Sequence, residues 1–199
     1  MTEPQEEQEP VFPDVQASVR NALILTCLLA IIYAVVFSFF GQVHQTDGVS
    51  LLASLGLGGV LLFLSYVDLR TGLLPDILTW PLVALGLGYA AHTGALVSAL
   101  SGAVIGYALI AGLALIWRQT RGYEGIGLGD AKLLAAGGAW IGVFSLPFVL
   151  LIASATGLVA AFTVSQKSHL DRHRVAIVFG PCLALGIWIA WCAPPIAVS

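Results

Sequence analysis

The sequence predicts an all-α membrane protein, a polytopic bundle of about seven transmembrane helices. Hydrophobic residues make up 58% of the 199 residues, and charged residues make up only 10%. Together with a mean hydropathy of +0.94, these values lie far outside the range of water-soluble domains. Apolar runs of membrane-spanning length recur along the chain, and the basic residues gather in every second connection between them.

Residues 1–20 precede the first apolar run, and we expect them to form a disordered, acidic, cytoplasmic tail. Four of the eleven acidic residues stand in the first ten positions, together with prolines. An acidic start is unlike the basic start of a cleaved signal peptide, and the first apolar run is too long for the apolar part of one. We therefore expect an extra N-terminal transmembrane helix and loop at 21–48, followed by the main membrane domain at 49–199.

Seven apolar segments are candidates for transmembrane helices, each of which needs roughly 20 apolar residues. The fifth segment is shorter than the others and rich in glycine. Gly137, Gly138 and Gly142 would let neighbouring helices approach closely, which suits a helix surrounded by protein. The segments are 22–40, 49–67, 77–92, 95–116, 131–146, 148–165 and 176–194.

The basic residues all fall on one side of the membrane if the seven segments alternate in direction. Cytoplasmic loops collect lysine and arginine, so this pattern predicts a cytoplasmic N-terminus and a C-terminus outside the cytoplasm. The opposite loops, 41–48, 92–95 and 142–147, carry no basic residue. The eight basic residues are Arg20, Arg70, Arg118, Arg121, Lys132, Lys167, Arg172 and Arg174.

The cysteines and tryptophans of the apolar runs show no pattern of a chemical site. The three cysteines have neither CxxC spacing nor a pairing pattern, so we expect no metal, disulfide framework or cofactor. We also expect no nucleic-acid partner. Three tryptophans and two prolines are interpreted as interfacial anchors and helix kinks. These residues are Cys27, Cys182, Cys192, Trp140, Trp188, Trp191, Pro147 and Pro181.

Two aspartates at predicted helix ends are candidates for chemistry. Asp68 directly follows the apolar run 61–67, where an ionised carboxylate is costly unless it is hydrated or paired, for example with Arg70. Asp130 follows three alternating glycines, which permit unusual backbone angles and close approach of a substrate chain. Taken alone, Asp130 is equally consistent with an ordinary helix N-cap.

The predicted topology places both aspartates on the cytoplasmic side. Two carboxyl groups within hydrogen-bonding distance do not both ionise readily, so they share a proton and can act as base and acid on an attacked carbonyl. This chemistry fits the hydrolysis of a peptide bond by an activated water at the membrane boundary.

Three segments carry a resemblance to a known family. They are DLRTGLLPDILT at 68–79, EGIGLGDAKLL at 124–134, and FGP at 179–181. In this order they resemble the three signature blocks of the type IV prepilin peptidases, which are GxGD-type membrane aspartyl proteases. The resemblance covers about residues 50–195 and implies a six-helix peptidase core with Asp68 and Asp130 as the catalytic pair.

Five further residues match family positions and are expected to support the site. Each has an ordinary alternative interpretation: Asp76 as the N-cap of the third helix, Lys132 as an anchor at the membrane surface, and Glu124 as a hydrated loop acid. The glycines would keep the backbone free of side chains that crowd a substrate. The supporting residues are Asp76, Gly127, Gly129, Lys132 and Glu124.

The resemblance also implies a function, a substrate and a location. The expected reaction removes the basic leader peptide from prepilins or pseudopilins of type IV pili or type II secretion, at the cytoplasmic face of the bacterial inner membrane. The expected partners are the substrate helix and the lipid bilayer; the sequence gives no indication of an oligomeric state. The cysteine-containing N-terminal region of full-length members is not matched, so we expect a short, peptidase-only form without N-methyltransferase activity.

Three other interpretations remain open at this point. A presenilin-like or signal-peptide-peptidase-like protease would fit Tyr66 and the segment 127–130, although the Pro-Ala-Leu motif expected near the C-terminus of that group is not found. A proton-coupled or cation-coupled transporter would use Asp68 and Asp130 to bind ions. A catalytically inactive scaffold would only bind pilin-like helices.

Overall fold

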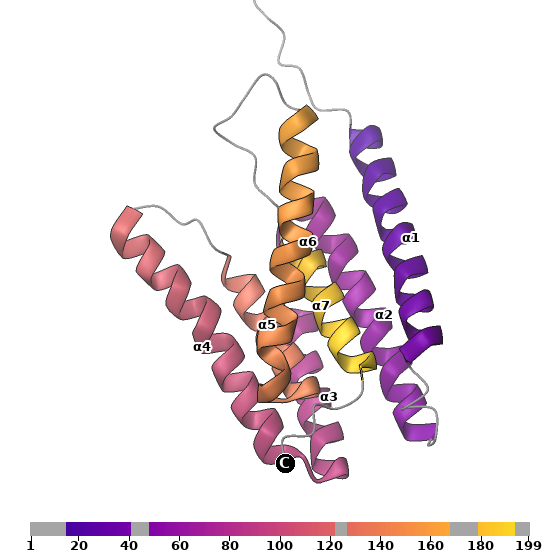
Figure 1. The fold of residues 1–199 in the computed structure, drawn as a ribbon, viewed down its shortest axis with the longest axis vertical. Helices are drawn as coiled ribbons and strands as arrows, with labels where there is room; N and C mark the ends of the chain where they lie inside the picture. Colours follow the sequence, from indigo (N-terminus) through magenta and orange to yellow (C-terminus); the bar gives the residue numbers. More distant parts are fainter. Residues whose placement is uncertain (1–14, 41–47, 122–126, 168–178, 194–199) are drawn as a thin grey trace, which may run out of the picture.

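The computed structural model describes residues 15–40, 48–121, 127–167 and 179–193. These ranges hold seven α-helices and one 3₁₀ helix and no β-strand, so the predicted all-α class is confirmed (Figure 1). The helices are α1 (Val15–Phe40), α2 (Gly48–Thr71), α3 (Asp76–Thr93), α4 (Leu96–Arg121), α5 (Leu128–Ile141), η2 (Val143–Ser145), α6 (Leu146–Lys167) and α7 (Gly180–Cys192).

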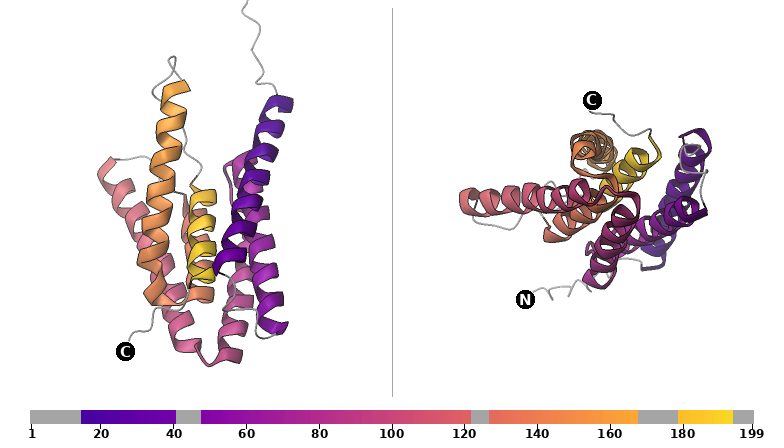
Figure 2. Two further views of the ribbon diagram at one scale, coloured as in Figure 1. Left: turned by 45° about the vertical axis from the view of Figure 1, so that its right-hand side comes forward. Right: turned by 90° about the horizontal axis from the view of Figure 1, so that it is seen from below.

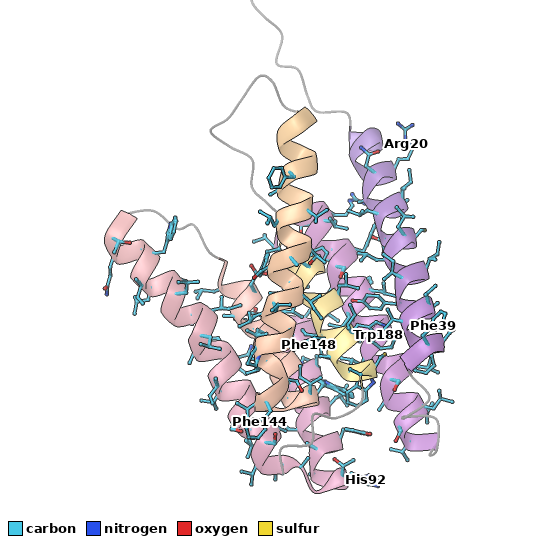
Figure 3. The ribbon with its side chains drawn as sticks, in the orientation of Figure 1. Arg20, Phe39, His92, Phe144, Phe148 and Trp188 are labelled. Atoms are coloured by element: carbon cyan, nitrogen blue, oxygen red, sulfur yellow. The ribbon has the colours of Figure 1, made fainter. Side chains whose placement is uncertain are left out.

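Consecutive helices run in alternating directions through the bundle (Figure 1). α1 and α4 form opposite flanks, and the shorter α5 and α7 lie between them, as the view from below also shows (Figure 2). Arg20 lies at one end of the bundle and His92 at the other (Figure 3). The alternation places the last turn of α2 and the first turn of α5 at the Arg20 end.

Within the part of the chain that the structure describes, four helical segments are long and apolar enough to cross a membrane. They are Arg20–Phe39, Gly48–Thr71, Leu96–Thr120 and Val143–Phe162. The other three predicted segments also form helices, but α5 and α7 have only 14 and 13 residues. At 1.5 Å per residue each is about 20 Å long, shorter than the roughly 30 Å hydrocarbon core. Their shortness is compatible with a membrane because most of their residues are buried among other helices.

Glycines bring α4 and α5 into direct backbone contact, as the glycine-rich fifth segment predicts. A Cβ at Gly138 would collide with the backbone of Gly102, and a Cβ at Gly106 would lie 2.8 Å from the Leu134 carbonyl oxygen. Gly142 ends α5 with a φ of +75°, a left-handed conformation that favours glycine. The chain therefore reverses here and enters α6.

The tryptophans join helices inside the bundle, so their interpretation as interfacial anchors is wrong. Trp188 stacks on Tyr33 with ring centroids 5.1 Å apart, and its indole N–H donates to the Tyr33 carbonyl oxygen. Trp140 donates to the carbonyl of Leu82, while Trp191 donates to the hydroxyl of Ser54. Burial of an indole is favourable when its N–H finds an acceptor, and each of the three does.

The two prolines interpreted as kinks instead lie at the starts of helices. Pro147 is the second residue of α6, and Pro181 is the second residue of α7. The first turn of a helix has free backbone N–H groups, so the missing N–H of proline costs little there.

Candidate active site

Asp68 lies in the last turn of α2 and is buried, with 5% of its surface exposed. Its Oδ2 accepts a hydrogen bond of 3.0 Å from the backbone N–H of Gly180, the first residue of α7. Arg70 instead donates to the hydroxyl of Tyr66 at 3.0 Å and lies over its ring. Asp68 is thus held by the start of α7, not by the arginine on its own helix.

Asp130 lies in the first turn of α5 and is half-buried. The N-cap of this helix is Gly127, and no side chain caps it, so the alternative interpretation of Asp130 as an N-cap is wrong. The helix begins earlier than that interpretation requires. Burial raises the pKa of the Asp130 carboxyl to about 6, and the nearby negative charge of Asp68 is the second cause.

The structure brings Asp68 and Asp130 together, although they belong to helices far apart in the chain. α7 packs against both α2 and α5, and joins the two helices that carry the acids. The thiol of Cys182, the third residue of α7, interacts electrostatically with both carboxyl groups. A negative charge on one of two nearby carboxyl groups disfavours ionisation of the other.

A salt bridge ties the start of α3 to the first turn of α5. The ammonium group of Lys132 donates to both carboxylate oxygens of Asp76, at 2.6 and 2.7 Å. Pro75 is the N-cap of α3, so the alternative interpretation of Asp76 as that cap is wrong. Because Lys132 follows Asp130 by two residues, the salt bridge fixes the segment that carries Asp130 against the start of α3.

The two predicted glycines beside Asp130 differ in their surroundings. A Cβ at Gly129 would lie 3.0 Å from the Cβ of Leu74, so glycine there allows the α2–α3 connection to pack on α5. A Cβ at Gly127 would meet its nearest neighbour, Asp130 Oδ2, at an ordinary 3.8 Å. Gly127 has φ −72° and ψ 130°, which any residue adopts, and Gly129 has no positive φ either. The expectation of unusual backbone angles is therefore wrong for both.

Gly180 is the residue beside the acids that sequence reasoning did not assign to the site. A Cβ at this position would collide with the carboxylate of Asp68, the nearest atom being Oδ2. The third family segment, at 179–181, contains Gly180, but the sequence does not indicate which residue Gly180 contacts. The contact joins residues of α2 and α7 that are remote in sequence, and hydropathy carries no information about such a pairing.

The remaining predicted site residue, Glu124, lies outside the described residues, so its supporting role stays a prediction. Over the ranges 15–40, 48–121, 127–167 and 179–193, no three His, Cys, Asp or Glu side chains gather as metal ligands would. His92 lies at the end of the bundle opposite Arg20 (Figure 3).

Comparison with known proteins relates the chain to peptidases of bacteria. Several relatives bear the name prepilin leader peptidase/N-methyltransferase, among them the following three. The relative from Escherichia coli K12 is 48% identical over 134 residues, which cover 64% of this chain and 57% of the relative. The relative from Burkholderia pseudomallei is 41% identical over 137 residues (68% and 44%), and that from Aeromonas salmonicida is 40% identical over 170 residues (84% and 55%). No solved structure matches significantly.

The family match and the matches to individual relatives cover different parts of the proteins. The chain spans about half the length of the curated relatives it matches. The pattern of the type IV leader peptidase family matches residues 55–162, more than half of the chain. This range contains Asp68, Asp76, Asp130 and Lys132. The chain therefore belongs to the type IV leader peptidase family.

Proposed function

We propose that this chain is a membrane aspartyl endopeptidase that removes the basic leader peptide from prepilins or related pseudopilins. The observation that carries the proposal is the convergence of Asp68 and Asp130 at one end of the bundle, where the charge of one shifts the titration of the other. The family match and the names of the relatives favour this function over a presenilin-like protease, an ion transporter or an inactive scaffold.

A pair of carboxyl groups with one proton is suited to amide hydrolysis. The ionised carboxyl accepts a proton from water, whose oxygen attacks the carbonyl carbon, while the protonated carboxyl donates its proton to the carbonyl oxygen. The tetrahedral diol then collapses: the C–N bond breaks, the leaving nitrogen takes a proton from one carboxyl, and the other recovers a proton from the diol. Both groups return to their starting states, and one water is consumed.

The location and orientation follow from charge and hydropathy. Four apolar helices and bacterial relatives point to the inner membrane of a bacterium. The end of the bundle that carries the two aspartates also carries Arg20, Arg70 and Lys132, which favours a cytoplasmic position for that end. A basic leader in the cytoplasm would approach this acid-bearing end, while the apolar helix of the substrate stays in the lipid.

The proposal covers the peptidase reaction alone. N-methyl transfer appears in the names of the relatives, which are longer than this chain. The residues that support the proposal, Asp68 and Asp130, suit hydrolysis and have no evident role in methyl transfer. Methylated product from the assay below would overturn the restriction to peptidase activity.

The test is cleavage of a full-length prepilin by the purified protein in lipid vesicles, with the released leader identified by mass spectrometry. The proposal predicts cleavage by the wild-type protein and a loss of at least about a thousandfold in kcat for Asp68→Asn and for Asp130→Asn. Asp47→Asn serves as a control, because Asp47 belongs to a loop predicted on the opposite side. Normal cleavage by either of the first two variants would contradict the paired-acid mechanism.

A further inference from the structure

The backbone at the start of α7 lies so close to Asp68 that a side chain at position 180 would not fit between them. The N–H of Gly180 donates to Asp68 Oδ2 at 3.0 Å, and this hydrogen bond is buried. An added Cβ would collide with Oδ2 and lie 2.9 Å from Cγ. Only glycine fits between the α7 backbone and this carboxylate without displacing one of them.

Backbone conformation does not explain the glycine at this position. Among the described residues, the glycines with a positive φ are Gly72, Gly94 and Gly142. Gly180 has no such requirement, so the absence of a side chain there is explained by the approach of Asp68.

The other residues in the first turn of α7 offer no N–H group to Asp68. Pro181 has no N–H, and the N–H groups of Cys182 and Leu183 donate to the carbonyl oxygen of Phe179 at 3.1 Å. The Gly180 N–H is therefore the first-turn donor directed at Asp68. It also lies at the positive end of the helix dipole, which favours a negative charge.

We propose that Gly180 is a positioning residue that holds Asp68 as the ionised member of the acid pair, so that Asp68 is the base and Asp130 is the acid. This inference rests on the proposed function and deepens it. Asp68 accepts the proton of the attacking water, and Asp130 donates its proton to the carbonyl oxygen. The hydrogen bond from Gly180 stabilises the charged form of Asp68, whereas no hydrogen bond to the carboxyl group of Asp130 is found among the described residues.

Other charged and titratable groups surround Asp68 on the elements packed around α2. Asp130 on α5 and Cys182 on α7 interact electrostatically with its carboxylate. Asp76 on α3 is bound by Lys132 of α5. On α2 itself Arg70 donates to Tyr66, and on α1 Arg20 is exposed. Asp130 is thus the acidic group whose titration is coupled to Asp68, and pH dependence of cleavage reports on the pair.

The experiment compares two glycine variants of α7. Gly180→Ala displaces Asp68, whereas the matched Gly186→Ala crowds the same helix against the Val149 carbonyl oxygen, at 2.8 Å, away from the acids. We measure kcat and KM for prepilin cleavage across pH, together with thermal stability. The expected result is a fall in kcat of about tenfold to a hundredfold for Gly180→Ala beyond that of Gly186→Ala, as for loss of a hydrogen bond to a charged group.

A backbone variant isolates the N–H from the added bulk. Glycolic acid introduced at position 180 by nonsense suppression replaces the amide N–H by an ester oxygen and adds no atom that could collide with Asp68. Because the ionised form of Asp68 then loses its donor, the acidic limb of the kcat profile is expected to move to higher pH while KM changes little.

The outcomes separate this inference from the proposed function. If the wild-type protein does not cleave prepilin, the proposed function fails. If it cleaves, but the ester variant retains the wild-type kcat and acidic limb, Gly180 has no positioning role. A shift in the basic limb alone would assign the proton to Asp68 and overturn the division of roles.

Discussion

The two carboxyl groups lie in two differently built parts of the site. In the Asp68 half α2 meets the start of α7, and in the Asp130 half the first turn of α5 meets the start of α3. Asp68 is buried where α2 meets α7 and is held by a backbone N–H. Asp130 is half-buried, and its segment is fixed from outside by the partly exposed pair of Asp76 and Lys132. Two chemically identical groups therefore acquire different environments from the elements that position them, before any substrate binds.

The same difference predicts how the halves respond to substitution. Every substitution at position 180 except proline keeps the backbone N–H, so the Asp68 half is sensitive chiefly to added bulk at Gly180. The Asp130 half depends on side chains at the edge of the bundle, where water partly replaces lost contacts. Changes there are expected to have graded effects.

Apart from replacement of Asp130 itself, the largest effect expected in the Asp130 half comes from bulk at Gly129. Gly129→Val places a branched side chain against Leu74, where even a Cβ would lie at 3.0 Å, and shifts the first turn of α5. We expect kcat for prepilin cleavage to fall by about tenfold to a hundredfold, since small misplacements of catalytic groups are costly. Gly127→Val should cost clearly less, because its Cβ has room. Equal losses would show that packing on Leu74 is not the cause.

An intermediate effect concerns the pH dependence of stability through Asp130. Its pKa is about 6 in the folded protein and 3.8 ordinarily, so the folded state holds a proton that the unfolded state releases. The resulting stabilisation is complete below the ordinary pKa and is lost as pH rises through about 6. The asparagine of Asp130→Asn does not ionise, so the variant does not lose this stability as pH rises.

The measurement is thermal unfolding of wild type and Asp130→Asn at a series of pH values. We expect the variant to gain stability relative to wild type as pH rises through the window, by about 1 to 3 kcal/mol. A difference between the two proteins that does not vary with pH would contradict the raised pKa of Asp130.

The smallest effect is expected at the salt bridge. Asp76→Ala and Lys132→Ala should each reduce cleavage several-fold, and a double-mutant cycle on unfolding should give a coupling of about 1 kcal/mol or less, because the pair is partly exposed. The charge swap Asp76→Lys with Lys132→Asp should recover part of the activity. If both single variants are as active as wild type, the salt bridge does not position Asp130.

Much of the fold was predictable because helices that cross a membrane must be rich in apolar residues. Apolar runs gave the positions of all seven helices, and the alternation of basic residues placed both aspartates at one end. The short lengths of α5 and α7 were less accessible, because their apolar sequences look the same whether lipid or protein surrounds them. The buried tryptophans were misassigned for the same reason: an indole suits either an interface or a core with an acceptor.

The sequence predicted candidate residues for the site but not their contacts. The motifs predicted Asp68 and Asp130 as a catalytic pair and Asp76 and Lys132 as supporting residues, and these roles stay predictions. That Lys132 binds Asp76, or that Gly180 donates to Asp68, depends on the lateral packing of helices, which no local pattern specifies.

Chemical cross-linking tests the convergence of the two acids most directly. In a variant lacking Cys27, Cys182 and Cys192, Asp68→Cys and Asp130→Cys are combined and treated with a short bifunctional thiol reagent, and the linked peptides are identified by mass spectrometry. A variant with Asp76→Cys and Lys132→Cys is the positive control, because those side chains lie in contact. We predict an intramolecular cross-link in both variants. A cross-link in the control but none between positions 68 and 130 would contradict the paired site.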